Sequence, residues 1–193
     1  GKPFMPAHWQ PQRVLVSGLV TDRADWVVEP DRETAPVHFT AWYIRRMCDA
    51  VAAHWAAEGC PRTIVNVPGV AWRKPMTDAL LRHGGAVLAR GVVLVDLVGN
   101  MTDAVRAERQ AMLAADSAAK SWDGPHRVDV VLSVARMDEG TDWVPCSHVF
   151  NIRIPSSPLR ILQRWARAGR GKWDIVGYPE KWADAMRMVF FVP

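Results

Sequence analysis

Residues 130–172, VVLSVARMDEGTDWVPCSHVFNIRIPSSPLRILQRWARAGRGK, contain two apolar runs, an acidic turn between them and an arginine-rich run. The first apolar run, which begins at Val128 and ends at Val134, and the second, from His148 to Ile154, each predict a buried strand. Ser157 is a candidate N-cap, and Pro158 behind it predicts the start of a helix that carries the arginines. The order of strand, turn, strand and helix is typical of an α/β domain.

The acidic turn, Asp138 to Asp142, directly follows the first of these strands. Ligands of open α/β sheets bind beyond the carboxyl ends of the strands, so the turn is well placed for a site. Gly140 permits a tight turn or a close approach of the backbone to a ligand. Asp142 can accept hydrogen bonds from a ribose or hold a neighbouring arginine. The alternative interpretation is a solvated acidic loop that binds nothing.

The arginine-rich run has the spacing of a helix with one polar face. Gln163 and Arg167 are four residues apart and share that face, and Arg170 joins them if the helical turn continues. Guanidinium groups fixed on a short, anchored helix suit the stabilisation of charge on a transferring phosphoryl group. The alternative is a basic surface helix without a catalytic role.

The rest of the chain alternates helical and strand patterns on either side of this stretch. Upstream, we expect a helix from Thr40 to Gly59, a strand over Thr63–Val67, a helix over Trp72–His83 stopped by Gly84 and Gly85, a strand over Val92–Val98, a helix from Thr102 or Asp103 to about Ala115, and a polar loop over Ser117–Arg127. Downstream, we expect a short helix after Pro179 and a last apolar run over Met188–Val192. Strands that are apolar on both faces and alternate with helices predict an α/β fold, a mostly parallel sheet sandwiched by helices.

Residues 1–40 differ in composition from the rest of the chain. They are rich in proline and polar residues and contain an apolar run between Val14 and Val20. We interpret them as an N-terminal arm or linker with a strand in it, and residues 41–193 as the domain proper.

Composition and charge limit the class of protein. With 49% hydrophobic and 23% charged residues, the 193-residue chain has the composition of a globular protein. No stretch is long and apolar enough for a transmembrane helix, and the first residues lack a signal-peptide core, so we expect a cytoplasmic protein without a membrane partner. The net charge of +4 permits binding to a phosphate backbone without establishing it.

The three cysteines give no sign of a disulfide framework or a metal site. Cys48, Cys60 and Cys146 are odd in number and far apart, form no C-x-x-C pair and have no histidine at metal-ligand spacing. We therefore expect no metal ligands in this chain and interpret each cysteine as a small buried apolar residue.

Two segments in this order resemble motifs of superfamily 2 helicases. Glu139-Gly140-Thr141-Asp142, with Pro145 after it, resembles motif V, and the run from Gln163 to Arg170, QRWARAGR, resembles motif VI. Thr63–Val67 with its following helix is similar to motif IV, and Val98-Gly99 with Arg106–Arg109 resembles the segment that precedes motif V. The resemblance covers about residues 40–172 and implies a C-terminal RecA-like helicase domain. It departs from the family at Ala166, where a glycine is usual.

The resemblance implies a role for each residue that matches a motif. Arg167 and Arg170 would be arginine fingers that reach the γ-phosphate of ATP, and Gln163 would orient the phosphate end or its water. Gly140 and Asp142 would contact the nucleotide. Asn66 and Ser133 at strand ends, together with Arg136, would be candidates for contacts to the backbone of DNA or RNA. Trp143 and Trp165 are candidates either for base stacking or for core and interdomain packing.

The chain lacks the other half of a helicase active site. It contains no G-x-x-x-x-G-K-[ST] loop and no Asp-Glu-Ala-Asp or Asp-Glu-x-His box. By the resemblance, ATP and Mg would be held mainly by a first RecA-like domain, encoded in the same gene or supplied by a partner chain, and this chain alone should not hydrolyse ATP. The alternative function is a non-catalytic RecA-like module that binds nucleic acid or protein. A small-molecule enzyme is disfavoured because no Ser/His/Asp or Cys/His grouping is evident.

Overall fold

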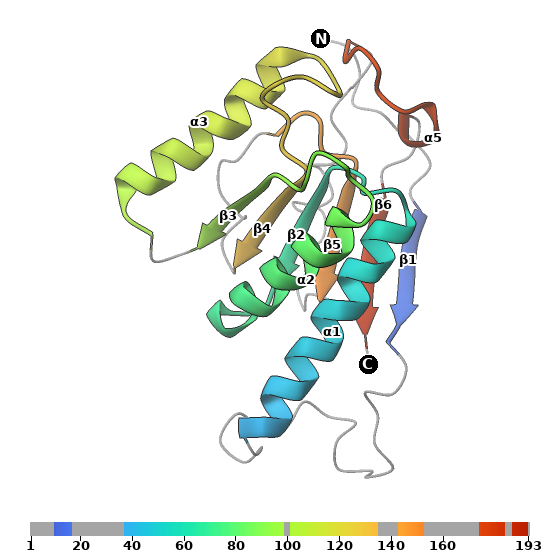
Figure 1. The fold of residues 1–193 in the computed structure, drawn as a ribbon, viewed down its shortest axis with the longest axis vertical. Coiled ribbons are helices and arrows are strands. Elements are labelled where there is room, and N and C mark those ends of the chain that lie inside the picture. Colours follow the sequence, from blue (N-terminus) through green and yellow to red (C-terminus); the bar gives the residue numbers. More distant parts are fainter. Residues whose placement is uncertain are drawn as a thin grey trace.

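A computed structural model of the chain describes residues 10–16, 37–98, 101–134, 143–152, 174–183 and 187–192. These residues form one six-stranded sheet in the order β1-β6-β5-β2-β4-β3, and every pair of neighbouring strands is parallel (Figure 1). The strands are β1 (Gln10–Leu15), β2 (Thr63–Val67), β3 (Leu94–Val98), β4 (Val130–Val134), β5 (His148–Ile152) and β6 (Arg187–Val192). All carboxyl ends of these strands therefore lie at one edge of the sheet.

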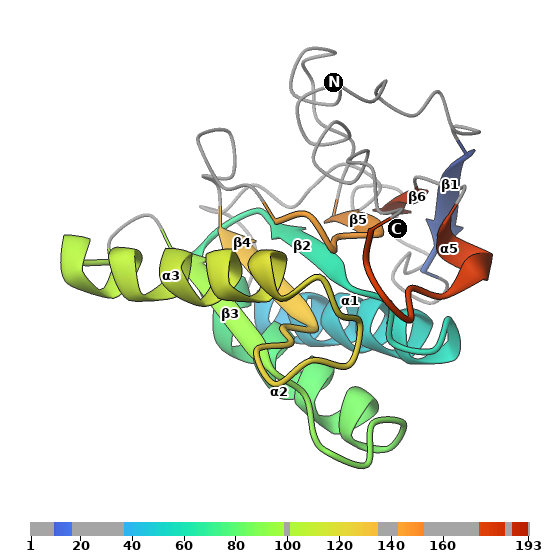
Figure 2. The same cartoon turned by 90° about the horizontal axis from the view of Figure 1, so that it is seen from above.

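Helices cover both faces of the sheet. The helical segments are α1 (Val37–Ala57), a short 3-10 turn η2 (Val70–Trp72), α2 (Arg73–Gly85), α3 (Asp103–Ala119) and the single turn α5 (Glu180–Ala183). Figure 2 shows α1 and α2 below the sheet and α3 above it. The connections through α1 and α2 cross the sheet in one direction, whereas the connection through α3 runs back. Because β-α-β crossovers are right-handed, a reversal of direction moves the helix to the opposite face.

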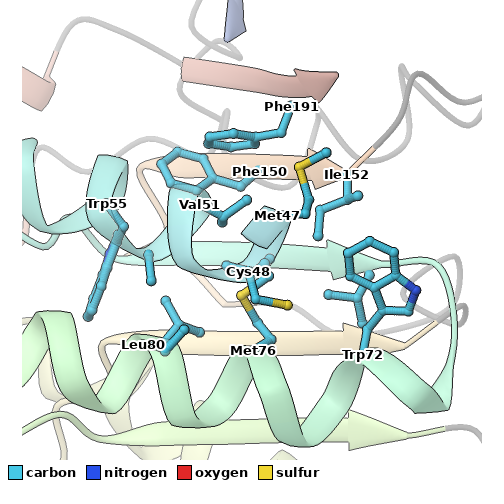
Figure 3. Packing of buried hydrophobic residues seen from close by; sticks show 14 of the residues in the cluster. Met47, Cys48, Val51, Trp55, Trp72, Met76, Leu80, Phe150, Ile152 and Phe191 are labelled. Atoms are coloured by element: carbon cyan, nitrogen blue, oxygen red, sulfur yellow. The ribbon is translucent and has the colours of Figure 1, made fainter. Parts of the chain in front are cut away.

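The face under α1 and α2 holds the larger apolar core. Met47, Val51 and Trp55 of α1 and Met76 and Leu80 of α2 are buried together with residues of the sheet. Figure 3 shows these side chains meeting Phe150, Ile152 and Phe191 between the helices and the strands. Alternate residues of a strand point to opposite faces, so the apolar pairs of β2 and β5 supply both cores at once.

The face under α3 holds a second core. Ile64, Val131 and Val149 of the three central strands are buried there with Leu113 of α3. Trp143, 1% exposed, and Cys146 pack into the same cluster. Trp143 is therefore a core residue, as the packing alternative predicted. Cys48, Cys60 and Cys146 are buried and form no disulfide with one another, which confirms their interpretation as small buried residues.

The glycines that were predicted to end α1 and α2 have different structural roles. Gly59 follows the end of α1 with a φ of +86°, a left-handed conformation that suits glycine. Gly84 lies inside α2, one residue before its end. A Cβ on Gly84 would lie 2.4 Å from Cζ3 of Trp55 and 2.5 Å from a methyl group of Val92. Gly84 thus allows α2 to approach α1 closely, beyond any role in ending the helix.

A buried ion pair lies at the amino end of β2. The guanidinium of Arg62, 0% exposed, donates from Nη1 to both carboxylate oxygens of Asp116 at 2.6 and 2.5 Å. Its Nη2 donates to the carbonyl of Trp122 at 2.5 Å, and its Cζ lies 4.7 Å from the centre of the Trp122 ring. Trp143 Nε1 also donates to Asp116, at 2.7 Å. The pair joins β2, α3 and the segment before β5.

A second buried carboxylate lies at the amino ends of β3 and β4. Asp129, 0% exposed, accepts from Arg127 Nε at 2.8 Å, from Arg90 Nη2 at 2.5 Å and from the backbone N–H of Val93 at 2.9 Å. Arg127 also pairs with Asp123. Both buried carboxylates have the charged and neutral donors that a buried charge requires.

The predicted fold class, a mostly parallel α/β sheet with helices on both faces, is confirmed. The predicted helices and strands that fall on described residues occur there, with ends that differ by a few positions. The largest difference is α3, which continues to Ala119, where the sequence predicted a polar loop from Ser117. Asp116 directly follows the predicted end of the helix, but in the structure it lies in the last turn of α3, from which it binds Arg62. The predicted helix after Pro158 lies outside the described residues.

The N-terminal arm contributes to the sheet. Strand β1 lies within residues 1–40 and pairs with β6 along its whole length, from Gln10 opposite Arg187 to Leu15 opposite Val192. Helix α1 begins at Val37, ahead of the predicted cap Thr40. The division of the chain at residue 40 stays a prediction, but the strand expected in the arm is an edge strand of the domain's sheet.

Candidate functional site

Three polar residues form a row across the centre of the sheet, one position before the carboxyl ends of their strands. Asn66 of β2 lies opposite Ser133 of β4 and opposite Asn151 of β5. Alternation along each strand places all three on the α3 face, with Ile64, Val131 and Val149. Asn66 Nδ2 donates to Asn151 Oδ1 at 3.1 Å. We call Asn66, Ser133 and Asn151 the polar row.

The polar row includes two residues that the sequence singled out. Asn66 and Ser133 are brought side by side by the register of β2 and β4. Both are buried, at 5% and 1% exposed, and the amide of Asn66 is already engaged with Asn151. A contact between either side chain and a nucleic-acid backbone stays a prediction.

The other predicted site residues are Arg136, Gly140, Asp142, Gln163, Arg167 and Arg170. All six lie outside the described residues, and their roles stay predictions. The described residues do define where their segments begin. Residues 135–142 follow the carboxyl end of β4, and residues 153–173 follow the carboxyl end of β5. These strands flank β2, so both segments start beside the polar row.

Asn151 was not predicted as a site residue. The sequence placed it inside an expected strand and gave it no role. A usable signal was present, because an amide within the apolar run around Phe150 and Ile152 must find a hydrogen-bond partner when the strand is buried. Only the register of β2 and β5 identifies that partner as Asn66.

A cluster of arginines lies around the carboxyl end of β3, and the sequence did not predict it as a site. Asp96 of β3, 8% exposed, accepts from Arg73 Nε at 2.5 Å, and Arg109 Nη2 lies 3.6 Å from its other oxygen. Arg73 is the first residue of α2, and Arg109 lies in the second turn of α3. The signal in the sequence is Asp96 itself, the one charged residue of its apolar run, which has to be paired when buried.

The start of α3 adds to this cluster. Thr102 caps the helix by accepting from the backbone N–H of Val105 at 3.4 Å. Arg106, 41% exposed at its side chain, lies 3.3 Å from the exposed Asp103. Figure 1 shows α3 starting beside the arrowhead of β3, so these groups lie at the same edge as the polar row. Exposed guanidiniums beside a helix N-terminus form a suitable surface for phosphate groups.

The described residues contain neither a metal site nor a membrane span. No three His, Cys, Asp or Glu side chains gather there in a way that could hold a metal ion. Within the same ranges, none of the helices is long and apolar enough to cross a bilayer. Among the described residues, the carboxyl edge carries the amide and hydroxyl groups of the polar row and the guanidinium groups of Arg73, Arg106 and Arg109, which can bind anions.

Comparison with known proteins finds matches among solved structures, and these concern the fold. No protein-family model and no curated protein matches the chain by sequence. Among solved structures, the C-terminal part of the Fun30 ATPase domain matches with a TM-score of 0.50 and 11% identity, over 76% of this chain and 40% of that one.

Two further structures have slightly lower scores. The Mycobacterium smegmatis helicase Lhr, bound to single-stranded DNA and AMP-PNP, has a TM-score of 0.49 and 17% identity over 74% of this chain and 16% of that one. The E. coli DEAD-box protein SrmB, bound to regulator of ribonuclease activity A, has a TM-score of 0.48 and 21% identity over 77% of this chain and 71% of that one. The chain thus spans less than half of the Fun30 and Lhr structures. The likeness to the Fun30 structure concerns the fold alone: the chain has a RecA-like α/β fold similar to that of the C-terminal part of the Fun30 ATPase domain.

Proposed function

We propose that this chain is the C-terminal half of an ATP-dependent nucleic-acid helicase or translocase, which supplies arginine fingers and part of the nucleic-acid track. The observation that carries the proposal is the point at which the two motif-bearing segments, residues 135–142 and 153–173, leave the sheet. They leave β4 and β5 at the carboxyl edge, on either side of β2, and ligands of parallel sheets bind at that edge.

The described ends of both segments support this placement. The motif V segment runs from Val134 to Trp143, and Trp143 is buried on the α3 face. The motif VI segment runs from Ile152 to Asp174, and the neighbouring Val176 forms a bridge with Ser121 just beyond α3. Both segments therefore start at the carboxyl edge and return to the α3 side of the sheet, which also carries the polar row.

In the proposed mechanism, Arg167 and Arg170 stabilise the charge on the transferring γ-phosphoryl group. Gln163 orients the phosphate end or its water, and Gly140 and Asp142 contact the nucleotide. ATP and Mg are held mainly by a first RecA-like domain, in the same polypeptide or in a partner chain, because the sequence here has no phosphate-binding loop. This chain contributes positive charge that acts most strongly in the transition state.

The proposed nucleic-acid track lies along the same edge. Asn66, Ser133 and Arg136 are the residues that the motif resemblance assigns to it. Arg73, Arg106 and Arg109 extend it toward β3, where they present guanidinium groups at the surface. The contacts would be to phosphates, which DNA and RNA share.

The test is the ATPase rate of this chain assembled with its ATP-binding first domain, in wild-type form and with Arg167→Ala or Arg170→Ala. We expect each variant to lower kcat by about a thousandfold, the order of magnitude for loss of an arginine finger, with a much smaller change in KM. Arg13→Ala, which removes an exposed arginine from β1, is the matched control and should leave kcat unchanged.

Near-normal ATPase rates in both finger variants would contradict the finger assignment. If the same variants retained nucleic-acid binding that did not respond to ATP, the result would support the alternative, a RecA-like binding module without a role in hydrolysis.

A further inference from the structure

A groove runs between α1 and α2 on the face of the sheet opposite α3. It has a volume of about 660 Å³. Its lining consists of Trp42, Arg45, Arg46 and Asp49 from α1, and Lys74, Pro75, Asp78, Ala79 and Arg82 from α2. We call it the α1/α2 groove. The proposed function does not use it, because the polar row lies on the other face.

The groove contains more positive than negative charge, and its acidic residues are already paired. Asp49 accepts from Arg82 Nη2 at 2.5 Å and lies 2.8 Å from His83 Nε2. The hydrogen bond with His83, assisted by Arg82, holds the pKa of Asp49 below its ordinary value. Asp78 accepts from Lys74 at 2.7 Å. Neither carboxylate is therefore available to neutralise further cations.

Two arginines of the groove remain for an external partner. Arg45 and Arg46 are exposed and form no ion pair with any residue that the structure describes. They are consecutive on α1. Arg45 and Arg46 follow Trp42 by three and four residues and precede Asp49 by four and three, so these four residues lie on one side of the helix. A planar guanidinium binds a carboxylate through two parallel hydrogen bonds, which makes this pair suited to anionic side chains.

The groove also has an apolar part. The side chain of Trp42 is 38% exposed, and Pro75 and Ala79 line the wall contributed by α2. A partly exposed tryptophan beside arginines is typical of the residues that anchor protein partners. The groove can thus accept one apolar side chain next to the carboxylates of a partner.

We propose that the α1/α2 groove binds an acidic segment of a partner protein, with carboxylates on Arg45 and Arg46 and an apolar side chain against Trp42. The apolar part of the groove favours a peptide over nucleic acid. A peptide can place an aliphatic side chain against Trp42, Pro75 and Ala79 next to its carboxylates, whereas a phosphate backbone carries no such group. The proposal does not depend on the proposed function, because it involves other residues on another face.

The test is binding of a fluorescein-labelled peptide of repeating Glu-Glu-Leu to the full 193-residue chain, measured by fluorescence anisotropy at low salt. Removing both guanidiniums in Arg45→Ala with Arg46→Ala should weaken binding about tenfold, the sum of two partly exposed ion pairs. The matched control, Arg13→Ala with Lys120→Ala, removes two exposed cations from elsewhere on the chain and should change affinity by under about twofold.

Two further probes separate the chemistry of the ligand. A peptide of repeating Gln-Gln-Leu should bind far more weakly, because it lacks the carboxylates. Replacing leucine by serine in the acidic peptide should weaken binding to the wild-type chain but not to Trp42→Ala. If the leucine contributes to affinity only when Trp42 is present, the two side chains are in contact.

Equal peptide affinities for the groove variant and the control would overturn the proposal. The proposal would also be overturned if the acidic peptide failed to bind and an oligothymidylate of matched charge lost affinity on removal of Arg45 and Arg46. That result would assign the groove to nucleic acid. Circular dichroism of the variants should match the wild type, since both arginines are exposed.

Discussion

The two edges of the sheet use arginine in opposite ways. At the amino edge, Arg62 is 0% exposed and binds Asp116, which is 1% exposed. At the carboxyl edge, the Arg73 side chain is 49% exposed and that of Arg109 is 29% exposed, although both approach one buried carboxylate. The amino edge therefore uses guanidinium groups to join segments of the chain, while the carboxyl edge presents them to solvent. Net charge alone cannot distinguish these uses.

The energetic consequence of the two arrangements differs. Removing one partner of a buried ion pair leaves an uncompensated charge in a medium of low polarity, which is strongly destabilising. Exposed ion pairs contribute little to stability, because water and salt screen them. Substitutions at the amino edge should therefore change stability, and substitutions at the carboxyl edge should change binding.

The largest expected effect is that of Arg62→Ala on stability. It leaves Asp116 without its guanidinium partner and the Trp122 carbonyl without a donor, so the free energy of unfolding should fall by about 3–5 kcal/mol. Urea denaturation followed by circular dichroism measures the change. The control is Lys74→Ala, which breaks an ion pair whose side chains are 84% and 54% exposed and should cost under about 1 kcal/mol. A loss for Arg62→Ala as small as the control's would mean that the amino edge is not held by this pair.

The next effect separates two adjacent glycines near the end of α2. A Cβ on Gly84 would overlap the ring of Trp55, so Gly84→Ala should destabilise the chain by about 1–3 kcal/mol. A Cβ on Gly85 meets no atom within 4 Å, so Gly85→Ala should be neutral or stabilise by up to about 1 kcal/mol. Thermal unfolding of the two variants in parallel measures the difference. Equal melting temperatures would show that Trp55 can move aside at little cost.

The sequence predicted most of the local structure because local structure follows the spacing of apolar residues. The strand at Thr63–Val67 was predicted with the bounds of β2, and the strand and helix that follow it were predicted within a few residues. The sheet order could not be predicted in the same way, because it depends on which strands pair across long stretches of chain. Arg62 and Asp116, for example, are 54 residues apart and only the fold brings them together.

The candidate site was predicted from motif resemblance. The structure adds which residues of distant strands and helices lie next to one another. Asn66 and Ser133 were singled out as strand-end residues, and the register places them side by side with Asn151. Asp96 and its arginines come from β3, α2 and α3, so no local pattern unites them. The buried position of Asp96 was nevertheless foreseeable as a charge that requires partners.

A smaller effect is expected at the carboxyl edge, in binding. Arg73→Gln and Arg106→Gln should each weaken the affinity for a single-stranded oligonucleotide by a few-fold, about 1 kcal/mol or less, and reduce the slope of log affinity against log salt by about one. Anisotropy titrations at several salt concentrations measure both quantities. Lys120→Gln, which removes a cation paired with Asp174, is the control and should leave the slope unchanged. Unchanged slopes for both arginine variants would remove them from the proposed track. Arg106→Gln should leave the unfolding curve unchanged, whereas Arg73→Gln also removes a partner of the buried Asp96 and should lower stability.

The smallest effect is a pH dependence at the amino edge, where His54 lies 5.6 Å from the ring of Phe150 and 5.5 Å from that of Phe191. Burial lowers the pKa of His54 below its ordinary 6.5, although Glu58, 4.0 Å away, opposes the shift. The unfolded chain therefore takes up a proton at a higher pH than the folded chain does, and stability should fall as the pH drops below about 6.5. Because the side chain is 24% exposed, the slope should stay well below the one-proton limit of about 1.4 kcal/mol per pH unit.

Urea denaturation of His54→Gln between neutral and mildly acidic pH tests this dependence. The variant cannot titrate at this position, so its stability should vary less with pH than that of the wild type. If His54→Gln kept the wild-type dependence on pH, burial of His54 would not be the source of the pH response.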